Sequence, residues 1–162
     1  MADEKFDFLV VIEGEANPRV VPGRLDATVE EVLALVAKDT GRTELVDLFI
    51  EDGDDPLVAG RTIRELVEGL DKLLHVATKG QVKVTVEYGQ HSVSREFRPS
   101  ATMERIIRWA AKEKQLNIEA PVEDLQLKLG KEVLPADTHL GQVTQGRKEI
   151  TFQLVFKIKP QG

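Results

Sequence analysis

The sequence predicts an α+β protein made of two copies of one small unit, each a mixed sheet packed on one helix. The first observation is an ordered repeat, in which landmark stretches recur roughly 75 residues apart. Residues 26–30 match residues 100–104, and residues 47–57 match residues 124–134. The second observation is that strand-like alternation in each copy surrounds one segment of helical periodicity. A helix with one apolar stripe needs a sheet face to cover it, which gives a two-layer unit.

Each copy begins with two strand-like runs. They read FDFLVVI and PRVVPGRL in the first copy, and VKVTVEY and SVSREFRP in the second. Alternation is clearest where Val82, Val84 and Val86 share one face of the predicted strand. These runs predict two adjacent strands at the start of each unit.

A helix follows the two strands in each copy. Thr28 is the expected cap of the first helix, and Glu31 three residues later completes a capping box. Thr102 is the expected cap of the second helix. Each helix then carries one apolar stripe. The stripes consist of Val29, Val32, Leu33 and Val36 in the first copy, and Met103, Ile106, Ile107 and Ala110 in the second.

The remainder of each copy is expected to complete the sheet. A third alternating run leads through a glycine-containing turn to a short run that ends at Leu57 or Leu134. Thr62 and Thr138 are the expected caps of one short helical turn, and the final strands read LLHVAT and TFQLVF. The predicted order in each copy is therefore β-β-α-β-β, a short helix, and β.

The repeat divides the chain into residues 1–78, a linker at 79–81, and residues 82–162. Lys79 and Gly80 separate the last strand-like run of the first copy from the first run of the second. Such a short linker restricts independent tumbling of the domains but does not by itself define the angle between them.

Composition excludes several functional classes. The chain has 162 residues, of which 41% are hydrophobic and 31% charged, as in ordinary globular proteins. The net charge of −6 argues against non-specific nucleic-acid binding, and the lack of cysteine removes disulfides, thiolate metal sites and cysteine nucleophiles. No apolar run approaches the roughly 20 residues of a membrane span, and MADEKF is no signal peptide. We therefore expect a cytoplasmic protein without nucleic-acid or membrane partners.

The last strand and its tail carry the most specific resemblance. The stretch TFQLVFKIK, followed by Pro160, Gln161 and Gly162, is similar to the end of ubiquitin-type modifiers, which reads TLHLVLRLR before two glycines. The stretches ATMERI and LGKEVLPADTHL also resemble that family. The resemblance covers both copies and implies two tandem ubiquitin-like β-grasp domains. Such a pair resembles the vertebrate interferon-induced tandem modifier and, more closely, the bacterial tandem modifiers of antiphage operons.

The resemblance implies conjugation rather than catalysis by this chain. The carboxylate of Gly162 would be adenylated with ATP, passed to a carrier thiol as a thioester, and attacked by a target lysine amine. The implied partners are an adenylating activating enzyme, a thioester-carrier enzyme, a deconjugating protease and target lysines. The chain itself needs no cofactor. The family's two glycines are here a single Gly162 after Pro160 and Gln161.

Several residues near the tail are candidates for recognition by the activating and carrier enzymes. Proline cannot donate a ladder hydrogen bond, so Pro160 should end the strand pairing. Lysine lacks the bidentate geometry of the family's arginine, so the enzyme surface that binds Lys157 should differ from the surface that binds that arginine. The recognition candidates are Val155, Lys157, Lys159, Pro160 and Gln161.

A sheet surface is the second candidate for partner binding. By resemblance, Val155 matches one member of an apolar patch on ubiquitin, whereas Gln126 and Lys128 make the neighbouring outward positions polar. Phe49 is the outward apolar residue of the first copy, and it is either a partner contact or a residue at the seam between the domains.

Other polar residues point to no chemistry. The stretch EDGDDP at 51–56 lacks the spacing of a calcium loop and is expected to be a solvated turn. His75, His91 and His139 lie in different elements at no ligand spacing, so we expect no metal site. Two functional alternatives remain: a non-conjugated adaptor made of two β-grasp domains, and a sulfur carrier whose terminal carboxylate becomes a thiocarboxylate.

Overall fold

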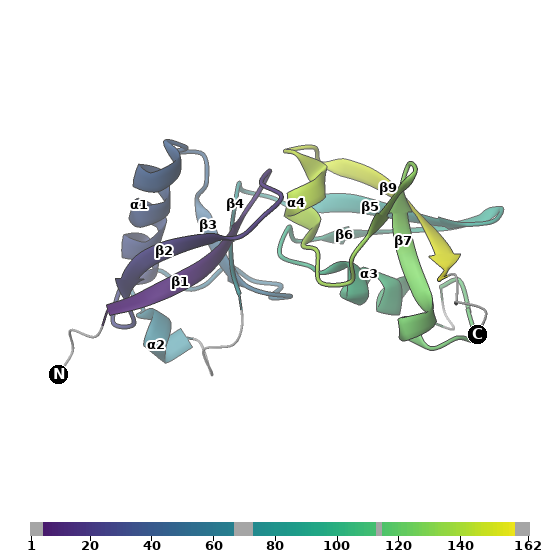
Figure 1. The fold of residues 1–162 in the computed structure, drawn as a ribbon, viewed down its shortest axis with the longest axis horizontal. Helices are drawn as coiled ribbons and strands as arrows, with labels where there is room; N and C mark the ends of the chain where they lie inside the picture. Colours follow the sequence, from purple (N-terminus) through teal and green to yellow (C-terminus); the bar gives the residue numbers. More distant parts are fainter. Residues whose placement is uncertain (1–4, 67–72, 113–114, 158–162) are drawn as a thin grey trace, which may run out of the picture.

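A computed structural model describes residues 5–66, 73–112 and 115–157 (Figure 1). It contains two sheets, one in each half of the chain, and each sheet has a helix across one face. The α+β class and the two-layer unit predicted from the repeat are therefore present twice. In the described part of the chain, no helix is long and apolar enough to cross a membrane.

The first domain is a four-stranded mixed sheet in the order β2-β1-β4-β3. The central strand β1 pairs antiparallel with β2 and parallel with β4, while β3 pairs antiparallel with β4. Its elements are β1 (Lys5–Ile12), β2 (Arg19–Arg24), α1 (Val29–Thr40), β3 (Asp47–Ile50), α2 (Ile63–Leu66) and β4 (Leu74–Ala77).

The second domain is a five-stranded mixed sheet in the order β6-β5-β9-β7-β8. Here β9 lies between β5, to which it is parallel, and β7, to which it is antiparallel. Its elements are β5 (Val82–Tyr88), β6 (His91–Phe97), α3 (Met103–Ala110), a 3-10 turn η1 (Val122–Asp124), β7 (Leu125–Leu129), β8 (Glu132–Leu134), α4 (Leu140–Thr144) and β9 (Glu149–Phe156).

The helix caps confirm most of the sequence prediction. Thr28 accepts a hydrogen bond from the Glu31 N–H at 3.3 Å, and Thr102 accepts one from the Arg105 N–H at 3.2 Å. Thr62 likewise accepts from the N–H of the third residue of α2. Thr138 is not the cap of α4, because that helix begins one residue later, after His139. His139 pairs with Thr102 in a short bridge, as Thr62 does with Thr28 in the first domain.

The first domain departs from the predicted repeat at its fourth strand. Leu134 ends the short strand β8 of the second domain, but no described strand ends at Leu57. Leu57 makes only one hydrogen bond to the sheet, from its N–H to the Leu48 carbonyl at 2.7 Å. The preceding acidic turn contains Pro56, which has no N–H to donate to a neighbouring strand. The backbone of this turn bonds to the second domain instead, through the Asp52 N–H and the Ser100 carbonyl.

Each domain has its own apolar core between its sheet and its long helix. Val11 and Phe49 are 1% and 0% exposed but belong to neither core. Alternation along β1 places Phe8, Val10 and Ile12 toward α1, and Val11 therefore on the opposite face of the sheet. That second buried face must be covered by something other than the first domain's helix.

Candidate functional site at the domain interface and the C-terminal strand

The second domain covers the outward face of β3, β4 and the end of β1 in the first domain. In Figure 1, α4 lies beside the end of β1. The Gly14 N–H donates to the Gly141 carbonyl at 2.8 Å, and the Gln142 side chain donates to the Ala16 carbonyl at 2.7 Å. Hydrogen bonds between the two domains therefore join them in addition to the linker.

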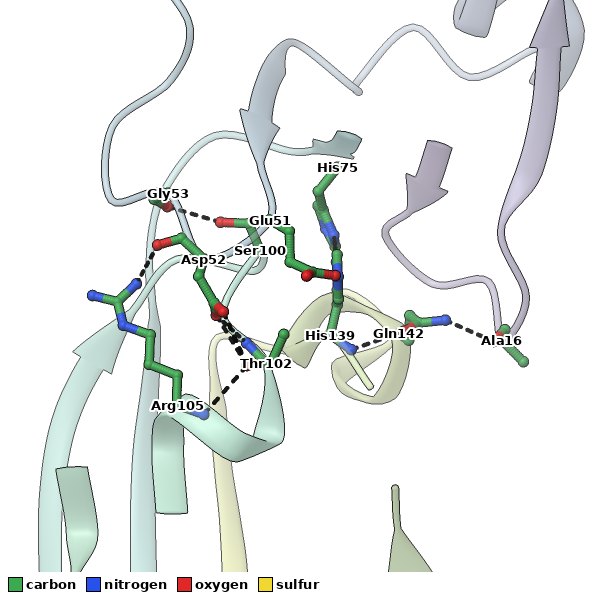
Figure 2. A network of polar contacts seen from close by, with 10 residues as sticks. All are labelled: Ala16, Glu51, Asp52, Gly53, His75, Ser100, Thr102, Arg105, His139 and Gln142. Carbon is green, nitrogen blue, oxygen red and sulfur yellow. Dashed lines mark hydrogen bonds and ion pairs between the residues drawn. The ribbon is translucent and has the colours of Figure 1, made fainter. Parts of the chain in front are cut away.

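The acidic turn after β3 caps a helix of the other domain. Asp52 adopts a left-handed backbone conformation with φ of 63°. Its carboxylate accepts from the Thr102 N–H at 2.7 Å and from the Thr102 hydroxyl at 3.0 Å (Figure 2). A carboxylate at a helix N-terminus satisfies free N–H groups and complements the helix dipole. Asp52 thereby fixes α3 of the second domain against the first.

The same turn is held by three further side chains of the second domain. Arg105 donates to the Asp52 carbonyl at 2.7 Å and forms an ion pair with Asp54. The Ser100 hydroxyl donates to the Gly53 carbonyl at 2.9 Å (Figure 2), and the Arg98 guanidinium donates to the Asp54 carbonyl at 3.0 Å. These contacts correct our expectation of a solvated turn at residues 51–56.

Two histidines meet at the centre of the interface. His75 on β4 and His139 before α4 are both 0% exposed, and their Nδ1 atoms lie 2.8 Å apart. The other nitrogen of His139, Nε2, is 2.7 Å from a carboxylate oxygen of Glu51 (Figure 2). If His139 donates its Nε2–H to Glu51, its Nδ1 can accept the Nδ1–H of His75. That chain of hydrogen bonds uses both imidazoles in their neutral form.

The His75 ring is poorly suited to carrying charge. Burial, and to a smaller extent the neighbouring His139, hold the pKa of His75 well below its usual value. Its Nε2 atom has no hydrogen-bond partner among the described residues. A neutral ring leaves only a lone pair there, whereas a protonated ring would bury an unsatisfied N–H. The interface therefore favours the neutral form of the His75 ring.

Gly141 allows the closest approach across this interface. A Cβ atom at this position would lie 2.7 Å from Nε2 and 2.9 Å from Cε1 of His75, and 3.1 Å from the Pro99 side chain. We therefore expect Gly141→Ala to lower the free energy of unfolding by about 1–3 kcal/mol. Thermal unfolding would measure the loss, and adding His75→Ala should recover part of it by making room. An unchanged melting temperature in Gly141→Ala would contradict the close packing.

Phe49 is not an accessible partner surface. Its side chain is 0% exposed, it pairs with His75 across β3 and β4, and the Arg98 guanidinium lies 5.8 Å from its ring centroid. The second domain therefore occupies the face on which Phe49 was a possible partner contact. Of the two alternatives from the sequence, the structure supports a residue at the seam between the domains.

Sequence reasoning missed the histidine pair and the acidic turn. In the described residues there is no group of three or more ligating side chains suited to a metal. The available signal was a polar residue, His75, at an outward position of an otherwise apolar strand, LLHVA. Its partner His139 lies 64 positions away in the chain, so no local pattern connects the two residues.

The C-terminal strand brings three of the sequence candidates together. Gln126 and Val155 are direct neighbours in the β7–β9 ladder, and Lys128 is two residues further along β7. All three are partly exposed. The chain leaves the sheet at Lys157, whose N–H donates to the Asp124 carbonyl at 2.8 Å and whose side chain is exposed. The other candidates, Lys159, Pro160, Gln161 and Gly162, lie outside the described residues.

One family model and two solved structures are similar to parts of the chain. Residues 83–157 match the family of BilA ubiquitin-like domain 2. Caldiarchaeum subterraneum ubiquitin aligns with a TM-score of 0.40 and 15% identity, over 51% of this chain and 100% of that one. The N-terminal ubiquitin-like domain of the 4931431F19Rik protein aligns with a TM-score of 0.37 and 13% identity, over 51% of this chain and 80% of that one. Among curated proteins, none matches the chain.

The fold and the family match define an α+β protein with two ubiquitin-like β-grasp domains. The chain matches the ubiquitin-like family model over its second domain, residues 83–157, and its first domain shares the β-grasp arrangement. It resembles the BilA proteins, whose second ubiquitin-like domain is matched by its own second domain.

Proposed function

We propose that this protein is a ubiquitin-like modifier that is conjugated through Gly162 to lysines of target proteins. The observation that carries the proposal is an asymmetry between the two sheets. The outward face around Val11, Phe49 and His75 of the first sheet is buried beneath the second domain. Gln126, Lys128 and Val155 instead leave the second face accessible beside the strand that leads to the tail. The match to BilA ubiquitin-like domain 2 covers this same domain and strand.

The proposed chemistry is performed by partner enzymes on the terminal carboxylate. A carboxylate oxygen of Gly162 attacks the α-phosphate of ATP, forming an acyl-adenylate and releasing pyrophosphate. A carrier thiolate then displaces AMP to give a thioester, and a target lysine amine displaces that thiolate to form an isopeptide bond. Glycine suits the enclosed reaction channel because it has no Cβ atom. A deconjugating protease would hydrolyse the isopeptide bond between Gly162 and the target lysine.

The tail and the first domain would have separate roles. Lys157 and Lys159 would pair with acidic groups of the activating enzyme or carrier, and Pro160 would keep the tail out of the sheet. The first domain, held by the interface, would add a second surface at a fixed position on each modified target. We further propose a role in bacterial antiphage defence in the cytoplasm, which the similarity to BilA supports.

Removal of Gly162 tests the proposal. With the cognate enzymes and ATP, we expect the intact chain to give target-sized adducts on denaturing gels and the chain lacking Gly162 to give none. A chain lacking Ala2 is the matched control for a one-residue deletion and should react normally. Adducts of the shortened chain, or full function of a chain extended beyond Gly162, would favour the non-conjugated adaptor instead.

A further inference from the structure

An edge strand of the second domain borders a surface groove. β6 pairs with β5 on one side, and no strand of the described residues pairs with its other side. Its side chains Val93, Arg95 and Phe97 lie opposite Val86, Val84 and Val82 of the core, so they point toward α3. An unpaired edge offers a row of N–H and C=O groups to another extended chain.

The groove between β6 and α3 is strongly basic, although the whole chain has a net charge of −6. A hollow of about 310 Å³ there is lined by Asp52 and by four cationic side chains, together with Trp109. The cationic side chains are Arg95, Arg105, Arg108 and Lys112.

Trp109 lines this groove, and aromatic packing beneath it supports the cations. Phe97 and Trp109 pack edge to face, with centroids 5.3 Å apart. The guanidinium of Arg95 lies 4.8 Å from the centroid of Phe97. Arg95 and Lys112 are both exposed, and neither forms an ion pair within the described ranges 5–66, 73–112 and 115–157. Two of the four charges thus remain available to a partner.

The chain's own acidic turn already uses one end of this surface. Asp54 forms an ion pair with Arg105, and Asp52 contacts the same arginine through its carbonyl. Arg108 pairs with Glu104 on its own helix. The turn therefore shows how an acidic segment complements the groove near the interface. It leaves the remainder, around Arg95 and Lys112, without such a segment.

We propose that this groove binds an extended acidic segment of a partner protein, which adds as a strand to the free edge of β6. Strand addition would direct every second side chain toward α3, where carboxylates would meet Arg95 and Lys112. Backbone pairing would supply affinity, and the basic rim would select acidic sequences over basic ones. This binding goes beyond the proposed conjugation and does not need the tail.

A short end-blocked peptide of alternating threonine and glutamate is a suitable probe. We expect it to shift the amide NMR signals of β6 and α3 in the full chain and to slow hydrogen exchange along β6. Binding should weaken as salt rises, because the charges are exposed. A peptide with lysine in place of glutamate should bind at least about tenfold more weakly, and so should an N-methylated acidic peptide that lacks the donors for pairing.

Charge reversal provides the matched variants. Arg95→Glu with Lys112→Glu should weaken binding of the acidic peptide at least about tenfold, and the milder Arg95→Ala with Lys112→Ala should weaken that binding less. Neither residue makes a described hydrogen bond or ion pair with the first domain, so thermal unfolding should show the interface retained. Lys38→Glu with Arg64→Glu changes the net charge equally on exposed parts of the first domain and should leave binding unchanged.

Several results would overturn the proposal. Unchanged binding in Arg95→Glu with Lys112→Glu would show that the basic side chains do not bind the peptide. Equal binding of the N-methylated peptide would show that the peptide does not add as a strand to β6. Tighter binding of a short oligothymidylate at the same amides would assign the groove to nucleic acid instead of protein. NMR shifts confined to residues outside β6 and α3 would place the acidic segment elsewhere.

Discussion

Phe49→Ala is expected to undock the two domains while leaving each of them folded. The free energy that holds the interface should fall by about 3–5 kcal/mol, the usual cost of truncating a buried phenylalanine. Phe49 is 0% exposed but belongs to neither apolar core, so the loss falls on the contact between the domains. We expect one cooperative thermal transition in the native chain to become two, measured by calorimetry.

A matched control for this variant lies on the same sheet. Leu9→Ala also removes an apolar side chain from the first domain, but Leu9 is 46% exposed and should have little effect. NMR relaxation provides an independent measurement, because undocked domains reorient relative to one another more than docked ones, within the range that their short linker permits. A single transition and unchanged tumbling in Phe49→Ala would mean that the polar contacts of Asp52 and Gln142 suffice for docking.

The repeat and the local patterns predicted the individual domains well. The helix caps Thr28 and Thr102 could be predicted, because the cap bond joins residues three positions apart and a sequence pattern can show that spacing. The missing fourth strand of the first domain and the role of Asp52 could not be predicted in this way. Both depend on contacts between residues such as Asp52 and Thr102, which are 50 positions apart.

The candidate site was predictable only in its C-terminal part. The resemblance of the last strand placed Val155 on one surface with the outward positions Gln126 and Lys128, and the β7–β9 register pairs Val155 with Gln126. Phe49 shows the limit of such reasoning. Alternation identified its outward direction, but only the arrangement of the second domain shows that this face is covered.

The interface also explains why two ubiquitin-like domains can act as one body. Its contacts come from both ends of the first sheet: Asp52 holds α3, while Gly14 and Ala16 hold α4. Contacts at separate points resist rotation as well as separation. Under the proposed conjugation, a modified target would therefore present the second sheet face and the groove beside β6 at a defined distance and angle.

Mild acid is expected to weaken this arrangement through His75. The folded pKa of His75 is lowered, chiefly by burial and then by His139, while the unfolded chain should have the ordinary histidine pKa of about 6.5. Above that pH both states are neutral at His75, and its contribution to stability is complete. As the pH falls below it, only the unfolded state takes up the proton. The free energy of unfolding then falls by at most about 1.4 kcal/mol per pH unit until the lowered pKa is reached.

His75→Asn isolates this contribution, because asparagine can still donate to His139 Nδ1 but does not titrate. We expect the variant to be less stable at neutral pH, since it leaves a space beside Gly141, and to lose less stability than the native chain on acidification. His91→Asn replaces an exposed histidine and should follow the native pH profile. Chemical unfolding between neutral and mildly acidic pH measures all three. Parallel profiles for the native chain and His75→Asn would show that groups other than His75 control the acid response of the interface.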